Sequence, residues 1–211
     1  GAGHLGRCLA LAEAYFASGW RVEFVLTGDA FAHLLGSNCT WRVAKPDQTL
    51  DVVGQSAPDG CDVLVIDDYE RGELFETELR GIARCIVVLD DQTGRRHHCD
   101  LLIDAAVYVA DAYRNLAGDS AQFLVGPKYA LVRSDILAHR RRAMEQRRDR
   151  DVTNILLTFG ATDPAGLTLK LIEAVDKAFP ERTITIALSS RARDIEALRS
   201  RIAGSHRIRL L

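Results

Sequence analysis

Residues 63–91 read VLVIDDYERGELFETELRGIARCIVVLDD, two apolar runs that each end in a pair of aspartates. Continuous apolar runs of this length are typical of parallel strands that are covered on both faces. The charged, amphipathic stretch 72–84 between them predicts a crossover helix. The segment therefore predicts a parallel α/β sheet with Asp67-Asp68 and Asp90-Asp91 at the carboxyl ends of two strands.

The same alternation of apolar runs and amphipathic stretches continues on both sides of this segment. Leu5, Leu9, Ala12 and Phe16 recur at helical spacing before Gly19, which predicts a helix that ends there. The other predicted strands cover 22–26, 101–103, 123–125, 154–159 and 183–188, and the other predicted helices cover 5–17, 167–179 and 191–202.

A shift in composition divides the chain. Residues 139–150 (HRRRAMEQRRDR) carry six arginines against one Glu and one Asp. A nucleic-acid patch is one interpretation, but the formal net charge of -2 and the lack of any other basic stripe favour a linker or connecting helix. We predict two Rossmann-like domains, 1–138 and 151–211, and no nucleic-acid partner. We also expect an incomplete copy of a longer protein, because no strand precedes the first turn and 207–211 read as a strand in progress.

Composition narrows the class of protein. The 211 residues are 47% hydrophobic and 27% charged, which is ordinary for a globular chain. The five cysteines are scattered without a C-x-x-C pair, which favours reduced thiols in a cytoplasmic protein over disulfides or a zinc site. No apolar run approaches the roughly 20 residues of a spanning helix, and no signal peptide opens the chain, so we predict no membrane span.

The opening residues Gly1-Ala2-Gly3-His4-Leu5-Gly6 match G-x-G-x-x-G directly before a helix. Glycines let the backbone approach a phosphate, and the N–H groups of a helix start favour an anion. A helix start also disfavours the cationic form of His4, so we expect a neutral imidazole that can act as a base. Two alternatives remain: a tight turn with His4 as a polar cap, and a dinucleotide site of an NAD-type oxidoreductase.

Three further polar groups follow predicted strands, where ligands bind in open parallel sheets. Residues 67–70 suit a metal, a ribose or a helix cap. One carboxylate of Asp90-Asp91 is expected to fix the loop and the other to face a ligand, and we assign the second role to Asp91. The turn 158–164, with Gly160 and Asp163, is either a second anion site or a plain Asp-Pro turn.

Other catalytic motifs are absent or weak. Residues 97–100 (HHCD) contain metal-ligand residue types, but adjacent residues rarely converge on one ion, so we predict no metal. G-x-S-x-G, H-E-x-x-H and G-x-x-x-x-G-K-[ST] do not occur, which removes the commonest hydrolase, zincin and P-loop interpretations.

Six motifs in order resemble the UDP-2,4-diacetamido-2,4,6-trideoxy-β-L-altropyranose hydrolase family of pseudaminic acid biosynthesis, and the resemblance runs almost from end to end. They are GAGH with RCLALA (1–4 and 7–12), IDDY (66–69), LDD (89–91), HHCDLL (97–102), GPKYALVR (126–133) and FGATDP (159–164).

The resemblance implies a GT-B-like fold of two Rossmann-like domains and a metal-independent, cofactor-free hydrolysis of a UDP-linked sugar. It implies that His4 is the general base that activates water. Tyr69 and Arg133 would line the sugar or diphosphate site, with the Gly160 turn also at the cleft. Gly3, Asp91 and Asp163 complete the predicted substrate-binding set.

The chain departs from the family pattern at three positions. Ala161 stands where a second glycine is usual, Asp104 where an amide is common, and Asp68 where histidine is frequent. The family's glycine-rich and acidic loops that grip UDP would follow the last residue of this chain. Glycosyl transfer by a related polysaccharide enzyme and a non-catalytic sugar-nucleotide-binding module remain alternatives, and no oligomeric state is predicted.

Overall fold

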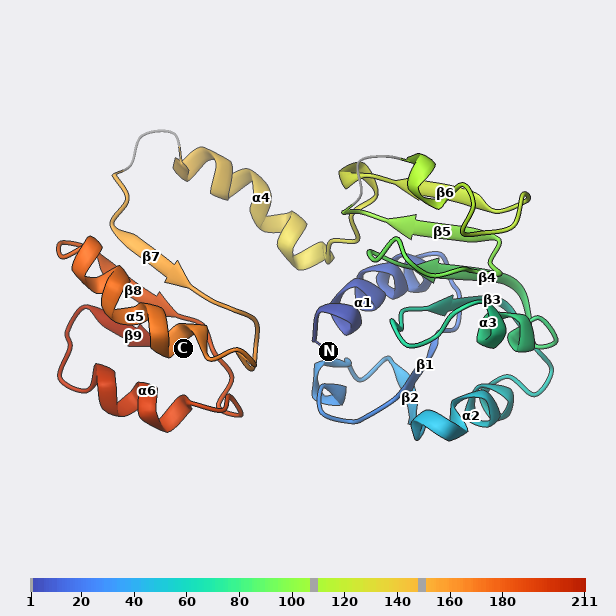
Figure 1. The fold of residues 1–211 in the computed structure, drawn as a ribbon, viewed down its shortest axis with the longest axis horizontal. Coiled ribbons are helices and arrows are strands. Elements are labelled where there is room, and N and C mark those ends of the chain that lie inside the picture. The colour runs from blue at the N-terminus through green and yellow to red at the C-terminus, as the bar shows by residue number, and fades with distance from the viewer. Residues whose placement is uncertain (1, 107–109, 148–150) are drawn as a thin grey trace. The chain divides into compact units, whose positions relative to one another are not determined.

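The chain forms two compact units, Gly1–Arg140 and Arg141–Leu211. The computed structural model describes residues 2–106, 110–147 and 151–211 (Figure 1). Within these residues all paired strands are parallel, in sheets of two, four and three strands. The predicted α/β class with parallel sheets is therefore confirmed, and the segment that follows residue 138 is part of a helix.

The first unit contains two sheets. The larger has the strand order β3-β4-β5-β6 and the smaller pairs β1 with β2. Their bounds are β1 (Glu23–Leu26), β2 (Thr40–Val43), β3 (Cys61–Ile66), β4 (Ala83–Leu89), β5 (Leu101–Asp104) and β6 (Gln122–Val125). Because β3 to β6 run parallel, their carboxyl ends lie at one edge of the sheet.

Helices connect and extend these strands. The α-helices of the first unit are α1 (Ala2–Ala17), α2 (Thr49–Ser56), α3 (Glu73–Leu79) and α4 (Ser134–Arg147), the last of which crosses the boundary between the units. Short 3₁₀ turns are η1 (Ala32–Leu34), η2 (Pro46–Gln48), η3 (Ala110–Tyr113) and η4 (Pro127–Tyr129). Figure 1 shows α1 running beside β3 and β4.

Strand β4 lies in the core of the first unit. Four consecutive side chains, Ile86 to Leu89, are all buried, as expected for a strand with both faces covered. On β3 only Ile66 is buried, in keeping with the position of β3 as an outer strand of this sheet. The two strands that were predicted alike from sequence therefore differ in burial according to their position in the sheet.

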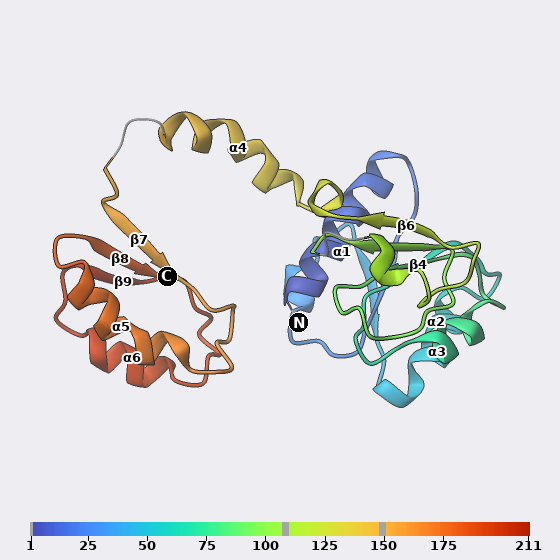
Figure 2. The ribbon, with the colours of Figure 1, turned by 45° about the horizontal axis from the view of Figure 1, so that its top comes forward.

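The second unit is smaller. It comprises β7 (Asn154–Leu157), α5 (Leu167–Ala178), β8 (Thr183–Ile186), α6 (Ile195–Ile202) and β9 (Ile208–Leu210), in the order β7-β8-β9. Both helices cover the same face of the sheet (Figure 2). Its core is built from Leu157, Ile172, Ile184, Ile186 and Leu198.

Several element bounds differ from the sequence prediction. Helix α1 begins at Ala2 rather than Leu5, and α3 ends at Leu79 because β4 already begins at Ala83. Strand β2 and helix α2 were not predicted. The sequence TWRV of β2 alternates polar and apolar residues, but over only four positions, the shortest run that indicates a strand. All four residues are exposed in the structure.

The basic segment around residue 140 is helical as far as Arg147. Helix α4 has no buried residue, and Ile136, Leu137 and Met144 are exposed on it. Residues 148–150 of the predicted connection lie outside the described residues. No helix in the described part of the chain combines the length and the apolar character needed to cross a membrane.

Replacement of Leu102 tests the core of the first unit. Leu102 on β5 is 0% exposed and packs in the cluster that contains Ile86 and Val88. Leu102→Ala should lower the free energy of unfolding by about 3 kcal/mol, because it leaves a cavity that the neighbours cannot fill. Urea denaturation measures this change. Leu74→Ala, at a position 82% exposed, is the control and should change stability by less than about 0.5 kcal/mol.

Candidate active site

Asp67, the first residue after β3, ties helix α1 to the carboxyl edge of the large sheet. The Arg7 guanidinium donates two hydrogen bonds to it, Nε to Oδ2 at 2.6 Å and Nη2 to Oδ1 at 2.5 Å. The Asp67 side chain is only 4% exposed, so this bidentate pairing supplies the compensation that a buried carboxylate needs.

His4 contacts the same carboxylate. Its Nδ1 lies 3.0 Å from Asp67 Oδ1 and 3.3 Å from the Asp67 carbonyl oxygen. Since both neighbours are acceptors, we assign the proton to Nδ1, which leaves the lone pair of the neutral ring on Nε2. The side chain is 28% exposed, so Nε2 is accessible to a small reactant. The arrangement is that of a histidine base oriented by a carboxylate.

Tyr69 and Asp91 complete the cluster. The Tyr69 hydroxyl donates to Asp91 Oδ2 at 2.7 Å, and Arg7 Nη1 donates to the same oxygen at 3.0 Å. The Tyr69 ring meets His4 edge to face, with centroids 4.5 Å apart. Burial and the hydrogen bond to Asp91 raise the pKa of Tyr69, so the phenol keeps its proton.

These contacts define what the cluster can do with charge. Arg7 already bonds two carboxylates, Asp67 and Asp91, and its pKa is raised first by the hydrogen bond to Asp67. The Arg7 guanidinium is therefore already paired with protein carboxylates and is not available to bind a phosphate. The cluster offers one imidazole nitrogen and hydrogen-bonding groups, which suits neutral hydroxyl or amide groups more than a diphosphate.

Cys8 lies one residue beyond Arg7 and directs its thiol to Asp67 Oδ2 at 3.5 Å. Burial, together with the Asp67 carboxylate, raises the pKa of Cys8 far above its ordinary value. The thiolate is the nucleophilic form of cysteine. Cys8 is therefore a packing residue and weak donor here, not a nucleophile.

Asp90, the neighbour of Asp91, belongs to a buried polar network behind the cluster. Its Oδ1 accepts a hydrogen bond from Arg95 Nη2 at 2.5 Å and its Oδ2 one from the Tyr113 hydroxyl at 3.0 Å. His97 Nε2 lies 3.7 Å from Asp90 Oδ2, a distance for ion pairing but not for a hydrogen bond. Burial opposes ionisation of Asp90, but its contacts with His97, Arg95 and Tyr113 lower its pKa to about 2.

His97 is held from its other side by Glu76 of α3. Nδ1 lies 2.7 Å from Glu76 Oε1, and both side chains are 0% exposed. Burial alone would lower the pKa of His97, but the carboxylates of Asp90 and Glu76 raise it to about 9. His97 is therefore a buried cation between two acids at neutral pH.

The HHCD segment does not gather its side chains. His97 faces Glu76, whereas Nδ1 of His98 lies 2.8 Å from Thr77 Oγ1 at the surface. Within the described residues, no three His, Cys, Asp or Glu side chains are placed to hold a metal ion.

Asp104 and Asp68 are two positions that depart from the pattern of the family that the sequence resembles. Both carboxylates accept hydrogen bonds from neighbouring backbone groups. Asp104 is 0% exposed, with Oδ2 2.8 Å from the Tyr113 hydroxyl and Oδ1 accepting from Ala106 N at 2.7 Å. Asp68 Oδ1 accepts from Glu70 N at 2.9 Å, which closes the turn after β3.

The expected glycine turn at the chain start is corrected by the structure. Gly1 lies outside the described residues, and from Ala2 onward the backbone is already α1, so Gly3 and His4 lie in its first turn. A Cβ on Gly3 would meet nothing within 4 Å, so packing does not require a glycine there. The contacts of His4 and Arg7 with Asp67 hold this first turn against the loop after β3.

Arg133 does not join the cluster. It precedes α4, and its guanidinium donates to Asp135 from Nε at 3.1 Å and from Nη2 at 2.7 Å. Its side chain is 38% exposed. Its predicted role toward substrate stays a prediction.

Gly160 and Asp163 belong to the second unit. Gly160 has a φ of 82°, which requires the freedom of glycine, and Asp163 has a φ of 44°. The Asp163 carboxylate accepts from Leu167 N at 3.0 Å and Thr168 N at 2.7 Å, so it occupies the start of α5 itself. An anion at this helix start would have to displace it.

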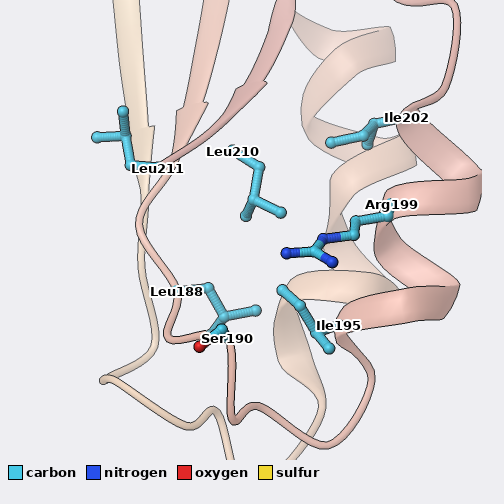
Figure 3. A pocket seen from close by; sticks show the side chains of 7 residues that line it. All are labelled: Leu188, Ser190, Ile195, Arg199, Ile202, Leu210 and Leu211. Atoms are coloured by element: carbon cyan, nitrogen blue, oxygen red, sulfur yellow. The ribbon is translucent and has the colours of Figure 1, made fainter.

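A cavity of about 520 Å³ in the second unit lies between β9 and α6 (Figure 3). Five aliphatic side chains line it with Ser190 and Arg199, whose guanidinium points inward and pairs with Glu196 at 2.9 Å. The cavity holds no acid or base that matches His4, so the candidate chemistry lies in the first unit.

The structure therefore brings His4, Tyr69 and Asp91 together. It adds Arg7, which was not singled out, and pairs it with Asp67, which was predicted only as part of the polar group 67–70 that suits a metal, a ribose or a helix cap. One signal was present in the sequence: His4, Arg7 and Cys8 are spaced i, i+3 and i+4, so they share one face of α1. The 60-residue separation of Arg7 from Asp67 gave no sequence signal.

The buried His97 makes stability depend on pH. Because its pKa rises from 6.5 to about 9 on folding, its contribution is complete below pH 6.5 and is lost as the pH rises towards 9. We expect a loss on the order of 3 kcal/mol in the free energy of unfolding across this range. Urea denaturation at pH 6 and pH 9.5 measures it. His97→Gln should flatten the dependence and His98→Gln should keep it; an equal slope in both variants would contradict the assignment.

No protein-family model matches the chain. The chain is 22% identical over 218 residues to a protein of Methanocaldococcus jannaschii, "Uncharacterized protein MJ1062", and the alignment covers 100% of this chain and 45% of that protein. The chain thus spans less than half the length of this curated relative, and the likeness assigns neither family nor function.

Proposed function

We propose that the chain carries the water-activating site of a nucleotide-sugar hydrolase, with His4 as general base and a UDP-linked diacetamido-trideoxy sugar as substrate. One observation carries the proposal: the contact of His4 Nδ1 with Asp67 Oδ1 at 3.0 Å, at the carboxyl edge of a parallel sheet where ligands bind. The motif resemblance to UDP-sugar hydrolases, which selects His4 independently, supplies the substrate class.

The proposed reaction needs few groups. Nε2 of His4 takes a proton from water while the water oxygen forms a bond to the anomeric carbon. The bond from that carbon to the UDP oxygen breaks, and the electron pair leaves with UDP. Because UDP is a good leaving group, a positioned base and hydrogen-bond donors suffice without a strong acid. Asp67 holds the ring and faces the imidazolium as it forms.

In this proposal Tyr69 and Asp91 bind the sugar. Asp91 is 29% exposed and accepts from both Arg7 and Tyr69 through Oδ2, so its other oxygen is the one available to a sugar N–H or O–H group. Arg7 is committed to carboxylates. Groups outside this cluster would therefore bind the diphosphate.

Substitution of His4 tests the base. His4→Gln should reduce the release of UDP from UDP-2,4-diacetamido-2,4,6-trideoxy-β-L-altropyranose by about 10²- to 10⁴-fold, the range for loss of a general base. Mass spectrometry measures free sugar and UDP with and without a sugar acceptor. In ¹⁸O-labelled water, attack at carbon places the label on the sugar and none on UDP.

The control is His33→Gln, at an exposed histidine of η1, which should keep full turnover. Strict dependence on an acceptor would replace hydrolysis by glycosyl transfer. Wild-type turnover in His4→Gln would overturn the assignment of His4 as the base. Label on UDP would overturn the assignment of the bond that breaks. No release of UDP by the unaltered chain would contradict the proposal for this chain.

A further inference from the structure

Arg95 joins the loops that follow β3 and β4. Its Nη1 donates to the carbonyl oxygens of Asp68 at 2.9 Å and Arg71 at 2.5 Å, and its Nη2 donates to Asp90 Oδ1 at 2.5 Å. One side chain thus fixes two backbone positions of the first loop to the first residue after β4. The side chain is only 22% exposed.

The loop that Arg95 holds carries a residue of the candidate active site. The Arg95 guanidinium carbon lies 5.9 Å from the centroid of the Tyr69 ring. The same ring also meets His4, with centroids 4.5 Å apart. A shift of the 68–71 loop would therefore move the ring that packs against the proposed base.

Arg95 is itself held by the buried network. Its partner Asp90 is 1% exposed and is fixed on its other side by the Tyr113 hydroxyl at 3.0 Å and by His97 at 3.7 Å. A buried carboxylate with these partners has little freedom to move, because loss of any contact leaves a charge or polar group unpaired. Asp90 thus gives Arg95 a rigid point of attachment in the core.

Arg95 is not placed as a phosphate ligand. Both N–H bonds of Nη1 and one of Nη2 already point to protein oxygens. Nε is buried and makes no hydrogen bond among the described residues. The contacts fit a side chain that holds the protein in place rather than one that waits for an anion.

We propose that Arg95 is a positioning residue of the candidate active site: by clamping the 68–71 loop to Asp90, it holds Tyr69 against His4. The predicted kinetic effect rests on the proposed function, whereas the geometric effect does not. A loss of turnover with little change in substrate affinity is expected, because misplacement of a catalytic group by about 1 Å can cost about 10²-fold in rate.

Three variants test the clamp. Arg95→Gln removes the charge and most of the donors, and Arg95→Lys keeps the charge with a smaller set of donors. Arg96→Gln is the matched control, since Arg96 is the next residue, is 72% exposed and pairs only with Glu73 of α3 among the described residues, at 3.4 Å. Thermal unfolding of each variant establishes that it is folded.

The first measurement does not need activity. In protein with ¹³C-labelled tyrosine and histidine rings, Arg95→Gln should shift the signals of both Tyr69 and His4, Arg95→Lys should shift them less, and Arg96→Gln should leave them in place. Unchanged Tyr69 and His4 signals in folded Arg95→Gln overturn the proposal. If Arg95→Gln does not fold, the comparison of Arg95→Lys with Arg96→Gln decides by the same criterion.

The second measurement separates positioning from binding. With the UDP-sugar, Arg95→Gln should lower kcat by about 10- to 100-fold with KM changed by less than about threefold. A raised KM with unchanged kcat would make Arg95 a substrate ligand and overturn the proposal. If the unaltered chain releases no UDP, the proposed function fails, and the ring signals still decide whether Arg95 clamps the loop.

Discussion

The buried ion pair between Arg7 and Asp67 is the contact on which the candidate active site depends. Asp67 emerges from a parallel strand with 4% of its side chain exposed, and a carboxylate in that position is stable only with a matched donor. Arg7 supplies that donor from α1. The ion pair therefore fixes the position of α1 relative to the carboxyl edge of the sheet. His4 lies one turn earlier on the same face, so the pairing that stabilises Asp67 also delivers the imidazole to it.

The neighbouring strand repeats this arrangement deeper in the protein. Asp90 follows β4 as Asp67 follows β3, and each is paired with an arginine at 2.5 Å. Tyr69 lies between the two pairs, with each guanidinium carbon 5.9 Å from its ring. The positive charges of Arg7 and Arg95 near Tyr69 are therefore already neutralised by carboxylates. The groups that remain available are the His4 imidazole and hydrogen-bonding groups. These groups suit recognition of a sugar and activation of water, and they leave a diphosphate to be bound elsewhere.

The sequence predicted which polar residues follow the strands, but not which of these residues form ion pairs with arginines. The apolar run at 86–89 predicted a buried parallel strand because its four side chains need cover on both faces, and β4 has it. Tyr69 and Asp91 were selected as candidates because ligand groups collect where parallel strands end. His4 was selected by the G-x-G-x-x-G match before a helix and by the motif resemblance, and the structure places it beside Tyr69. The contacts of Arg7 with Asp67 and of Arg95 with Asp90 were missed, since a charged residue in a loop or helix looks the same whether it faces solvent or a buried acid. The start of α1 was misplaced because glycine normally disfavours a helix, and here the first turn of α1 contains Gly3 and contacts Asp67.

Hydrolysis and glycosyl transfer place the same demand on the His4–Asp67 pair. In the proposed hydrolysis, as in the alternative transfer, Nε2 would accept a proton from an attacking O–H group while UDP departs, so the pair cannot itself select water over a sugar hydroxyl. The residues around Nε2 determine whether water or a sugar hydroxyl reacts. An acceptor sugar would need both space beside Nε2 and hydrogen-bond partners of its own. The Tyr69 ring packs against the imidazole, and its hydroxyl is already bonded to Asp91. A small nucleophile needs only the exposed part of His4, and this asymmetry in size favours water as the reactant in the proposed reaction.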